Sequence, residues 1–510
     1  MQQYLTLDFA IVAAYLLLTL IVGLVTSRGI KTMKDYVIGD RKRLTAPVLV
    51  ATFFATVVGA GTTMGSAEKV FAEGLIWMCI GFGCACERVL VAYYIVPYIN
   101  RFREKLSIGE VMGSVYGKPG QVIIGAAGAF VQLGIVGLQV SSIGYFLHYF
   151  LGMPHLWGVL VGSGIVIVYS SVGGIRSVTA TDIIQFAALV IIVPLLAFTV
   201  LENVGWSKGV CAKVPVSHFD FFAHKDIWKC LTFFMLFSIP SLSPAIAQRL
   251  LMAKSAEQAC HALKTVAILQ FVLTLLIALI GLGAAAIKPD LDPRLAFPYL
   301  IDKVLSVGFK GIGIAGLVAI IMSSADSFLH SAAVSLVHDV VQPLLRYPLS
   351  GDKELKWTQI TTLLMGFGAA WVAISFQNIF SLWFAAMNFW KPIVAVPLIA
   401  GLVGYYSSIR SFGIATATGL ATVLIWPLSL GQYIPINAAI PAVLANLAVF
   451  ALARQFDTSK NIYYDPDDIM APLAKAKKEQ EEKLRAEGKL PAFSLANWLL
   501  QRVKAAAGSF

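Results

Sequence analysis

The sequence predicts an all-α protein that crosses a membrane many times. Of its 510 residues, 58% are hydrophobic and only 13% are charged, and the mean hydropathy is +0.77. A soluble domain carries roughly 25% charged residues. An apolar helix of about 20 residues spans a bilayer, and the chain contains about thirteen such segments. Backbone polar groups in lipid must be paired internally, so each span must be helical or buried in protein.

The predicted spans are about 7–27, 46–70, 75–99, 121–150, 156–174, 183–203, 228–250, 263–287, 311–337, 358–376, 378–405, 411–430 and 436–454. Residues 1–455 form the predicted transmembrane domain. Within it, the second to eleventh spans, about 46–405, form the predicted core. Residues 456–510 are rich in Lys, Glu and Ala, which predicts a charged helical tail.

The net charge of +11 is distributed as the positive-inside rule describes. The first and third predicted loops hold the basic residues, which are Arg28, Lys31, Lys34, Arg41, Lys42 and Arg43, and Arg101, Arg103, Lys105 and Lys118. The loops near Gly74 and Met153 have almost none. We therefore expect no nucleic-acid partner, an amino terminus outside and a cytoplasmic carboxyl terminus. The expected location is the inner (plasma) membrane of a bacterium.

The ninth span carries a polar run, Ser323-Ser324-Ala325-Asp326-Ser327, at the depth where lipid or packed helices surround it. Polar groups at that depth are costly and usually face a cavity or pathway. Neutral oxygen atoms suit a hard monovalent cation such as sodium. The alternative is that the hydroxyls of Ser323 and Ser324 bond back to carbonyls one turn earlier.

Two spans are predicted to be broken. The second contains Gly59, Gly61, Thr62, Thr63 and Gly65, and the seventh contains Ser241 and Ser243 between Pro240 and Pro244. Mid-span glycines and prolines free backbone carbonyls, although close helix packing and a simple proline kink are the alternatives. The breaks lie five spans apart, as in two inverted five-span halves, and such breaks indicate a transport site at the midplane. We expect the solute to bind between Gly59, Gly61, Thr62 and Thr63 on one side and Ser241 and Ser243 on the other.

Several motifs resemble the sodium/solute symporter family, which includes sodium-coupled proline, sugar, pantothenate and monocarboxylate transporters. They are Asp35–Arg41 (DYVIGDR), Tyr169–Gln185 (YSSVGGIRSVTATDIIQ), Gln248–Lys254 (QRLLMAK) and Met322–Ser327 (MSSADS). The resemblance extends over residues 1 to about 405. It implies a LeuT-type core, that is, an inverted five-plus-five helix repeat that works by alternating access.

The resemblance also implies a sodium site between spans two and nine. Its ligands would be the carbonyls of Ala55, Val58 and Ile320 and the hydroxyls of Ser323 and Ser324. Asp182 would lie near the inner end of the ion pathway. Its spacing to Gln185 is also that of a capping box at a helix start. Asp326 would organise span nine, with Arg249 as a possible partner.

Other charges lie inside predicted spans. Glu87 and Arg88 are adjacent in span three, where a structural role is the alternative to facing the bundle. Lys391 in span eleven could neutralise a carboxylate substrate, replace a second sodium ion, or extend to an interface. The aromatic residues Trp383, Phe384, Phe389 and Trp390 fit packing or an interfacial position better than a substrate cage.

We expect a sodium-coupled symporter that imports a small organic solute, either an amino acid such as proline or a carboxylate. Sodium would be the co-transported ion, and no cofactor is expected. Proton coupling in the same fold and a transporter-like sensor are the alternatives. An enzyme is not expected, because the histidines are scattered and form no metal or nucleophile pattern. The sequence does not indicate an oligomeric state.

Overall fold

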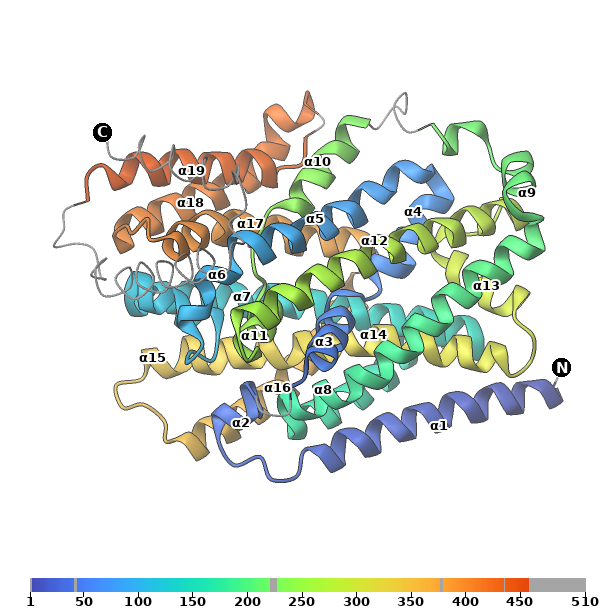
Figure 1. Ribbon diagram of the computed structural model, residues 1–510, viewed down its shortest axis with the longest axis horizontal. Coiled ribbons are helices and arrows are strands. Elements are labelled where there is room, and N and C mark those ends of the chain that lie inside the picture. The colour runs from blue at the N-terminus through green and yellow to red at the C-terminus, as the bar shows by residue number, and fades with distance from the viewer. Residues whose placement is uncertain (1, 41–43, 221–226, 377–378, 435, 458–510) are drawn as a thin grey trace, which may run out of the picture. The chain divides into compact units, whose positions relative to one another are not determined.

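The chain folds into packed helices joined by short connections in the computed structural model (Figure 1), which describes residues 2–40, 44–220, 227–376, 379–434 and 436–457. Among these residues, nine helices are long and apolar enough to cross a membrane, or ten when one bent pair is counted as a span. Residues 458–510, most of the predicted tail, lie outside the described part of the chain.

All of the predicted spans fall on helices. The long helices are α1 (Gln2–Thr26), α5 (Met78–Tyr94), α7 (Ile108–Leu151), α8 (His155–Val204), α12 (Ala256–Ile287), α14 (Phe309–Val334), α16 (Gly351–Ser375), α17 (Ile379–Val403), α18 (Ile409–Ile425) and α19 (Ala439–Arg454). Shorter helices connect or extend them, namely α2 (Met33–Val37), α6 (Val96–Ile99), α9 (Trp206–Lys213), α13 (Ala296–Val304) and α15 (Gln342–Leu344).

The number of long uninterrupted helices is smaller than the number of predicted spans, because the second and seventh spans are broken and α8 contains both the fifth and the sixth. It is kinked at Gly174, where φ is 49° and ψ is −153°. This left-handed φ favours glycine. A Cβ at this position would also lie 2.7 Å from the carbonyl oxygen of Tyr36. Gly174 therefore allows α2 to pack closely against the kink.

Both predicted breaks are confirmed. The second span consists of α3 (Ala46–Val57), a π-helical turn over Gly61–Gly65, and α4 (Ser66–Glu73), and its two parts are bent by 64°. The seventh span consists of α10 (Ile227–Ser238) and α11 (Pro244–Met252), separated by a non-helical segment. Proline is favoured in the first helical turn, where its missing N–H would have no partner. Pro244 therefore begins α11.

Helix α14 lies at the centre of the packing. In the segment Phe309–Leu344 that contains it, 94% of an apolar stretch of 18 residues is buried, compared with 17% of such a stretch in Leu7–Thr26 of α1. It packs against α1, α3, α7, α8, α11 and α16. The polar run of the ninth span is therefore enclosed by protein, where its hydroxyls and carboxylate meet side chains and backbone of other helices.

Candidate functional site

The oxygen atoms of the predicted sodium site lie together where the break in α3 meets the middle of α14. The Ser324 hydroxyl donates to the carbonyl oxygens of Val58 at 2.8 Å and Ala55 at 3.2 Å. The Ser323 hydroxyl reaches the Ala55 carbonyl oxygen at 3.1 Å and the Ile320 carbonyl oxygen at 2.8 Å. All of these residues are buried. Carbonyl and hydroxyl oxygens thus converge on one point from two helices.

The local backbone explains why these carbonyls are available. Helix α3 ends at Val57, and Val58 has extended φ and ψ angles of −102° and 107°. The interruption leaves the last carbonyls of the helix without their usual partners one turn ahead. The back-bonding alternative is also observed for Ser323, whose bond to Ile320 lies within α14. It does not account for Ser324, whose hydroxyl bonds to α3 and the residue that follows it.

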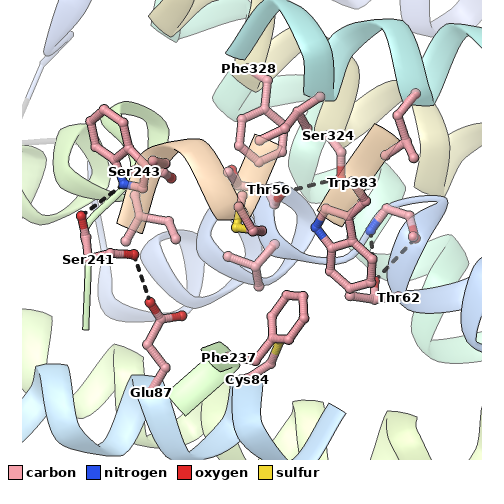
Figure 2. Close-up of a pocket in the computed structure, with 18 of the residues that line it drawn as sticks. Thr56, Thr62, Cys84, Glu87, Phe237, Ser241, Ser243, Ser324, Phe328 and Trp383 are labelled. Atoms are coloured by element: carbon pink, nitrogen blue, oxygen red, sulfur yellow. Dashed lines mark hydrogen bonds between the residues drawn. The ribbon is translucent and has the colours of Figure 1, made fainter. Parts of the chain in front are cut away.

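A cavity lies beside these oxygens, between the two breaks (Figure 2). The cavity has a volume of about 80 Å³. Of the residues predicted to bind the solute, those that line the cavity are Gly59, Gly61, Thr62, Ser241, Ser243 and Lys391. Ser324 lines it as well, so the cavity adjoins the cluster of sodium-type ligands. Thr63 is not among the lining residues, and its hydroxyl donates to the carbonyl oxygen of Gly59 at 2.8 Å.

Gln139 of α7 is a lining residue that the sequence reasoning missed. Its Oε1 accepts a hydrogen bond from the backbone N–H of Ala60 at 2.8 Å, so it binds the broken part of the second span. Gln132 lies seven residues earlier on the same buried face, and its amide donates to the hydroxyl of Ser331 at 2.6 Å. Two glutamines spaced by two helical turns in an apolar span were the available signal.

Aromatic and apolar side chains form much of the remaining wall. Trp383 and Phe237 face the cavity from α17 and α10 (Figure 2). Their rings lie 4.8 Å apart between centroids. A Cβ added at Gly61 would lie 2.9 Å from the Trp383 ring. Trp383 therefore both packs, as expected, and lines the cavity.

Three charged side chains gather at the other end of the cavity. The carboxylate of Glu87 lies 3.7 Å from Lys391 Nζ and 3.8 Å from an Arg88 guanidinium nitrogen. Lys391 Nζ also donates to the carbonyl oxygen of Ile239 at 2.8 Å, one of the carbonyls freed by the second break. Lys391 is only 2% exposed. It does not extend to an interface, because its partners hold it inside the bundle.

Asp182 lies in a buried network that links α8 to α3 and α11. Its carboxylate accepts a hydrogen bond from the Thr52 hydroxyl and lies 3.6 Å from an Arg249 guanidinium nitrogen. The capping interpretation is wrong, because the second part of α8 starts just after Gly174 and Asp182 is inside it. Asp326 instead accepts a hydrogen bond from the Tyr169 hydroxyl at 2.7 Å. The ion-pair partner of Arg249 is therefore Asp182 rather than the predicted Asp326.

A family model, the sodium:solute symporter family, matches residues 36–406. The chain belongs to this family. The match covers both broken spans, the polar run of α14 and Lys391, so the site described above lies inside the family's characteristic region.

Curated relatives transport different solutes. The chain is 26% identical to the high-affinity choline transporter 1 of Drosophila melanogaster, over 73% of this chain and 63% of the relative. It is 26% identical to the sodium/glucose cotransporter of Vibrio parahaemolyticus, over 68% of this chain and 71% of the relative. It is 24% identical to the high-affinity proline transporter PutP of Bacillus subtilis, over 80% of this chain and 89% of the relative. The chain thus spans less than two thirds of the choline transporter.

Solved transporter structures share the fold. A sodium-coupled sialic acid symporter superposes with a TM-score of 0.75 at 18% identity, over 89% of this chain and 98% of the other. Mhp1, a nucleobase-cation-symport-1 family transporter, superposes with a TM-score of 0.58 at 13% identity, over 87% and 99%. The chain is therefore an integral membrane protein with the LeuT-type fold of sodium-coupled symporters.

Proposed function

We propose that this protein imports a small organic solute together with sodium by alternating access. The observation that carries the proposal is the cluster of carbonyl and hydroxyl oxygens at Ala55, Val58, Ile320, Ser323 and Ser324, which joins α3 to α14 beside a cavity. These are neutral, hard oxygen ligands of the kind that sodium accepts. We further propose that the protein lies in a bacterial inner membrane, with its amino terminus outside and its carboxyl terminus in the cytoplasm.

Sodium would act by linking α3 to α14. The serine hydroxyls now donate to carbonyls across this junction. A bound cation would take the carbonyl and hydroxyl oxygens as ligands in place of these hydrogen bonds. The ion would thereby stabilise one arrangement of the broken span against α14 and shape the adjoining cavity. Such coupling is reciprocal, so the solute must raise sodium affinity by the same factor.

The membrane potential would drive accumulation. An inside-negative potential contributes about 2.3 kcal/mol per charge for each 100 mV. One sodium ion entering with each neutral solute therefore supports a concentration ratio of about 50 from 100 mV alone. A solute with one negative charge would need two sodium ions to gain the same ratio from the potential. Asp182, which is bonded to Thr52 of α3 and paired with Arg249, would lie on the path that the ion takes to the cytoplasm.

The solute would bind in the cavity between the two breaks. Gly59, Gly61 and Thr62 line one side, and Ser241 and Ser243 line the other. An amino acid such as proline and a carboxylate both fit this combination of small polar groups with apolar walls. In this proposal, Thr63 supports the site from behind, through its bond to the carbonyl of Gly59.

The test is the melting temperature of the purified protein in sodium compared with potassium and N-methylglucamine at matched ionic strength, over a pH series. A ligand that binds the native state raises the melting temperature. We expect stabilisation by sodium alone, which saturates and is independent of pH near neutrality. Stabilisation that follows pH and ignores the cation would overturn sodium coupling in favour of proton coupling.

A further inference from the structure

The solute cavity contains an excess of positive charge. Its lining includes one acidic side chain, Glu87, and two basic ones, Arg88 and Lys391, so the basic groups outnumber the acid by one. Arg88 is 6% exposed and Lys391 2%. The single carboxylate of Glu87 is shared between both cations, at 3.8 Å and 3.7 Å. Buried charge that lacks a counter-charge is costly.

Hydrogen-bond donors at this end of the cavity are also unused. Arg88 Nε and the Ser243 hydroxyl have no hydrogen-bond partner. Both residues are less than a tenth exposed, so water does not readily replace the missing partner. The ammonium of Lys391 has three protons; one is donated to the Ile239 carbonyl oxygen, and the ammonium also faces the Glu87 carboxylate at 3.7 Å. Buried polar groups are normally paired. A ligand that accepts several hydrogen bonds would satisfy these groups.

The rest of the wall suits a small apolar body. Phe237, Phe328, Trp383 and Met387 line it, and the space is small. Aromatic walls can hold a quaternary ammonium group by cation–π attraction. Here the neighbouring positive charges would repel such a group, so the cavity is unsuited to the choline named for several relatives.

From these observations we propose that the transported solute is a small monocarboxylate, with its carboxylate at the Arg88–Lys391 end and its apolar part against the aromatic wall. The proposal rests on the proposed function, because it takes this cavity as the solute site. The solute would supply the missing negative charge, and carboxylates pair well with guanidinium groups.

The experiment measures binding of matched compounds to the purified full-length protein by thermal shift, in sodium sulfate and in potassium sulfate. The compounds are acetate, pyruvate, L-lactate and benzoate, together with acetamide, lactamide, benzamide, L-proline, choline and chloride. Each amide matches its acid in shape but lacks the charge. We expect at least one monocarboxylate to bind at least about tenfold more tightly than its amide, and choline to bind more weakly than either.

Two changes of opposite sign separate a charge effect from misfolding. Lys391→Met removes the excess of basic over acidic side chains in the cavity lining. Carboxylate affinity should therefore fall at least about tenfold, while amide affinity changes little. Glu87→Gln raises the excess, so carboxylate affinity should rise. The control is Lys310→Met, because Lys310 also pairs with an acid, Asp302 at 2.7 Å, but does not line the cavity. It should leave carboxylate affinity unchanged.

The outcomes are distinguishable from those of the sodium proposal. Four results would overturn the carboxylate proposal and leave sodium coupling intact, provided that sodium stabilises the protein. They are equal affinity for acids and amides, preference for choline or proline, binding of chloride alone, and no binding of any monocarboxylate. Carboxylate binding that is the same in sodium and potassium would support the charge argument and count against sodium coupling.

Discussion

Ser324 is the residue on which the junction of α3 and α14 depends most. Its hydroxyl reaches the carbonyl oxygens of Ala55, Thr56 and Val58. One hydroxyl has a single proton to donate, so the three carbonyl oxygens share it, although the Ala55 oxygen is also within reach of the Ser323 hydroxyl. A cation has no such limit, because it attracts every oxygen around it. The geometry of the cluster is therefore better matched to an ion than to a single proton.

The Asp182–Arg249 pair gives a prediction at the residue scale. Both side chains are fully buried, so Asp182→Asn leaves the guanidinium without its charge partner. We expect a loss of about 3–5 kcal/mol in unfolding free energy, measured by denaturation in detergent. The control is Asp292→Asn, because Asp292 pairs with Arg294 at 2.8 Å on the surface. An exposed pair contributes about 0–1 kcal/mol. Equal losses in the two variants would contradict the buried role.

The broken helix and the hydroxyl pair are both visible in the chain, and the resemblance to the symporter family implied which carbonyl oxygens would lie beside them. It could not predict the meeting of Glu87, Ile239 and Lys391, since this depends on how three spans pack side by side. The contact of Gln139 with Ala60 was hidden for the same reason. Side-chain partners that are distant in sequence are fixed by tertiary packing.

The interruption of the second span is the element that forms the site. Gly59 sits in it with little free space, because a Cβ there would lie 2.6 Å from the Ser324 hydroxyl oxygen and 2.6 Å from the Gln139 amide nitrogen. The lack of a side chain at this position lets α3, α7 and α14 meet.

Gly59→Ala tests this element. The added methyl group should displace the Ser324 hydroxyl, so we expect sodium affinity to fall by at least about tenfold, or ~1.4 kcal/mol. Sodium-dependent thermal shift measures it. Gly164→Ala in α8 is the matched control, because a Cβ there meets nothing within 4 Å. Unchanged sodium affinity in Gly59→Ala would show that the close approach does not matter to the ion.

The start of α18 gives a pH-dependent prediction. Asp457 accepts hydrogen bonds from the Ser408 N–H at 2.8 Å, the Ser407 hydroxyl at 2.8 Å and the Ser411 hydroxyl at 3.0 Å. Burial alone would raise the pKa of Asp457, but these hydrogen bonds outweigh it and lower the pKa. The ionised form is therefore stabilised by folding, and this stabilisation is lost as the pH falls through the folded-state pKa.

Asp457→Asn should thus cost about 1 kcal/mol at pH 7, which is typical of a lost helix cap. The cost should be full above the unfolded pKa of about 3.9 and should shrink at lower pH, where the wild-type carboxylate is itself protonated. Melting temperatures of both proteins at pH 7 and near pH 3 measure it. A difference that stays constant over this range would contradict the role of the ionised carboxylate.

On the scale of the whole molecule, hydropathy and punctuation by glycine and proline predicted the order of helices and the position of both breaks. Hydropathy cannot distinguish a loop from a kink. The fifth and sixth predicted spans meet at a kink within α8, which the sequence indicated only by Gly173 and Gly174. The central place of α14 was likewise visible only as polar residues in an apolar span. The fold was thus more predictable than the side-chain contacts that line its cavity.

The central claim is that sodium binds where α3 meets α14. Its most direct test is equilibrium binding of radioactive sodium to the purified protein, to the Ser323→Ala/Ser324→Ala variant and to Ser163→Ala. Ser163 is a buried serine of α8 whose hydroxyl bonds back to Leu160 at 3.2 Å, so it controls for the loss of a hydroxyl. We predict saturable binding that potassium does not displace, weakened at least about tenfold in the double variant and unchanged in Ser163→Ala. Binding of equal strength in the double variant and the wild type would contradict the account.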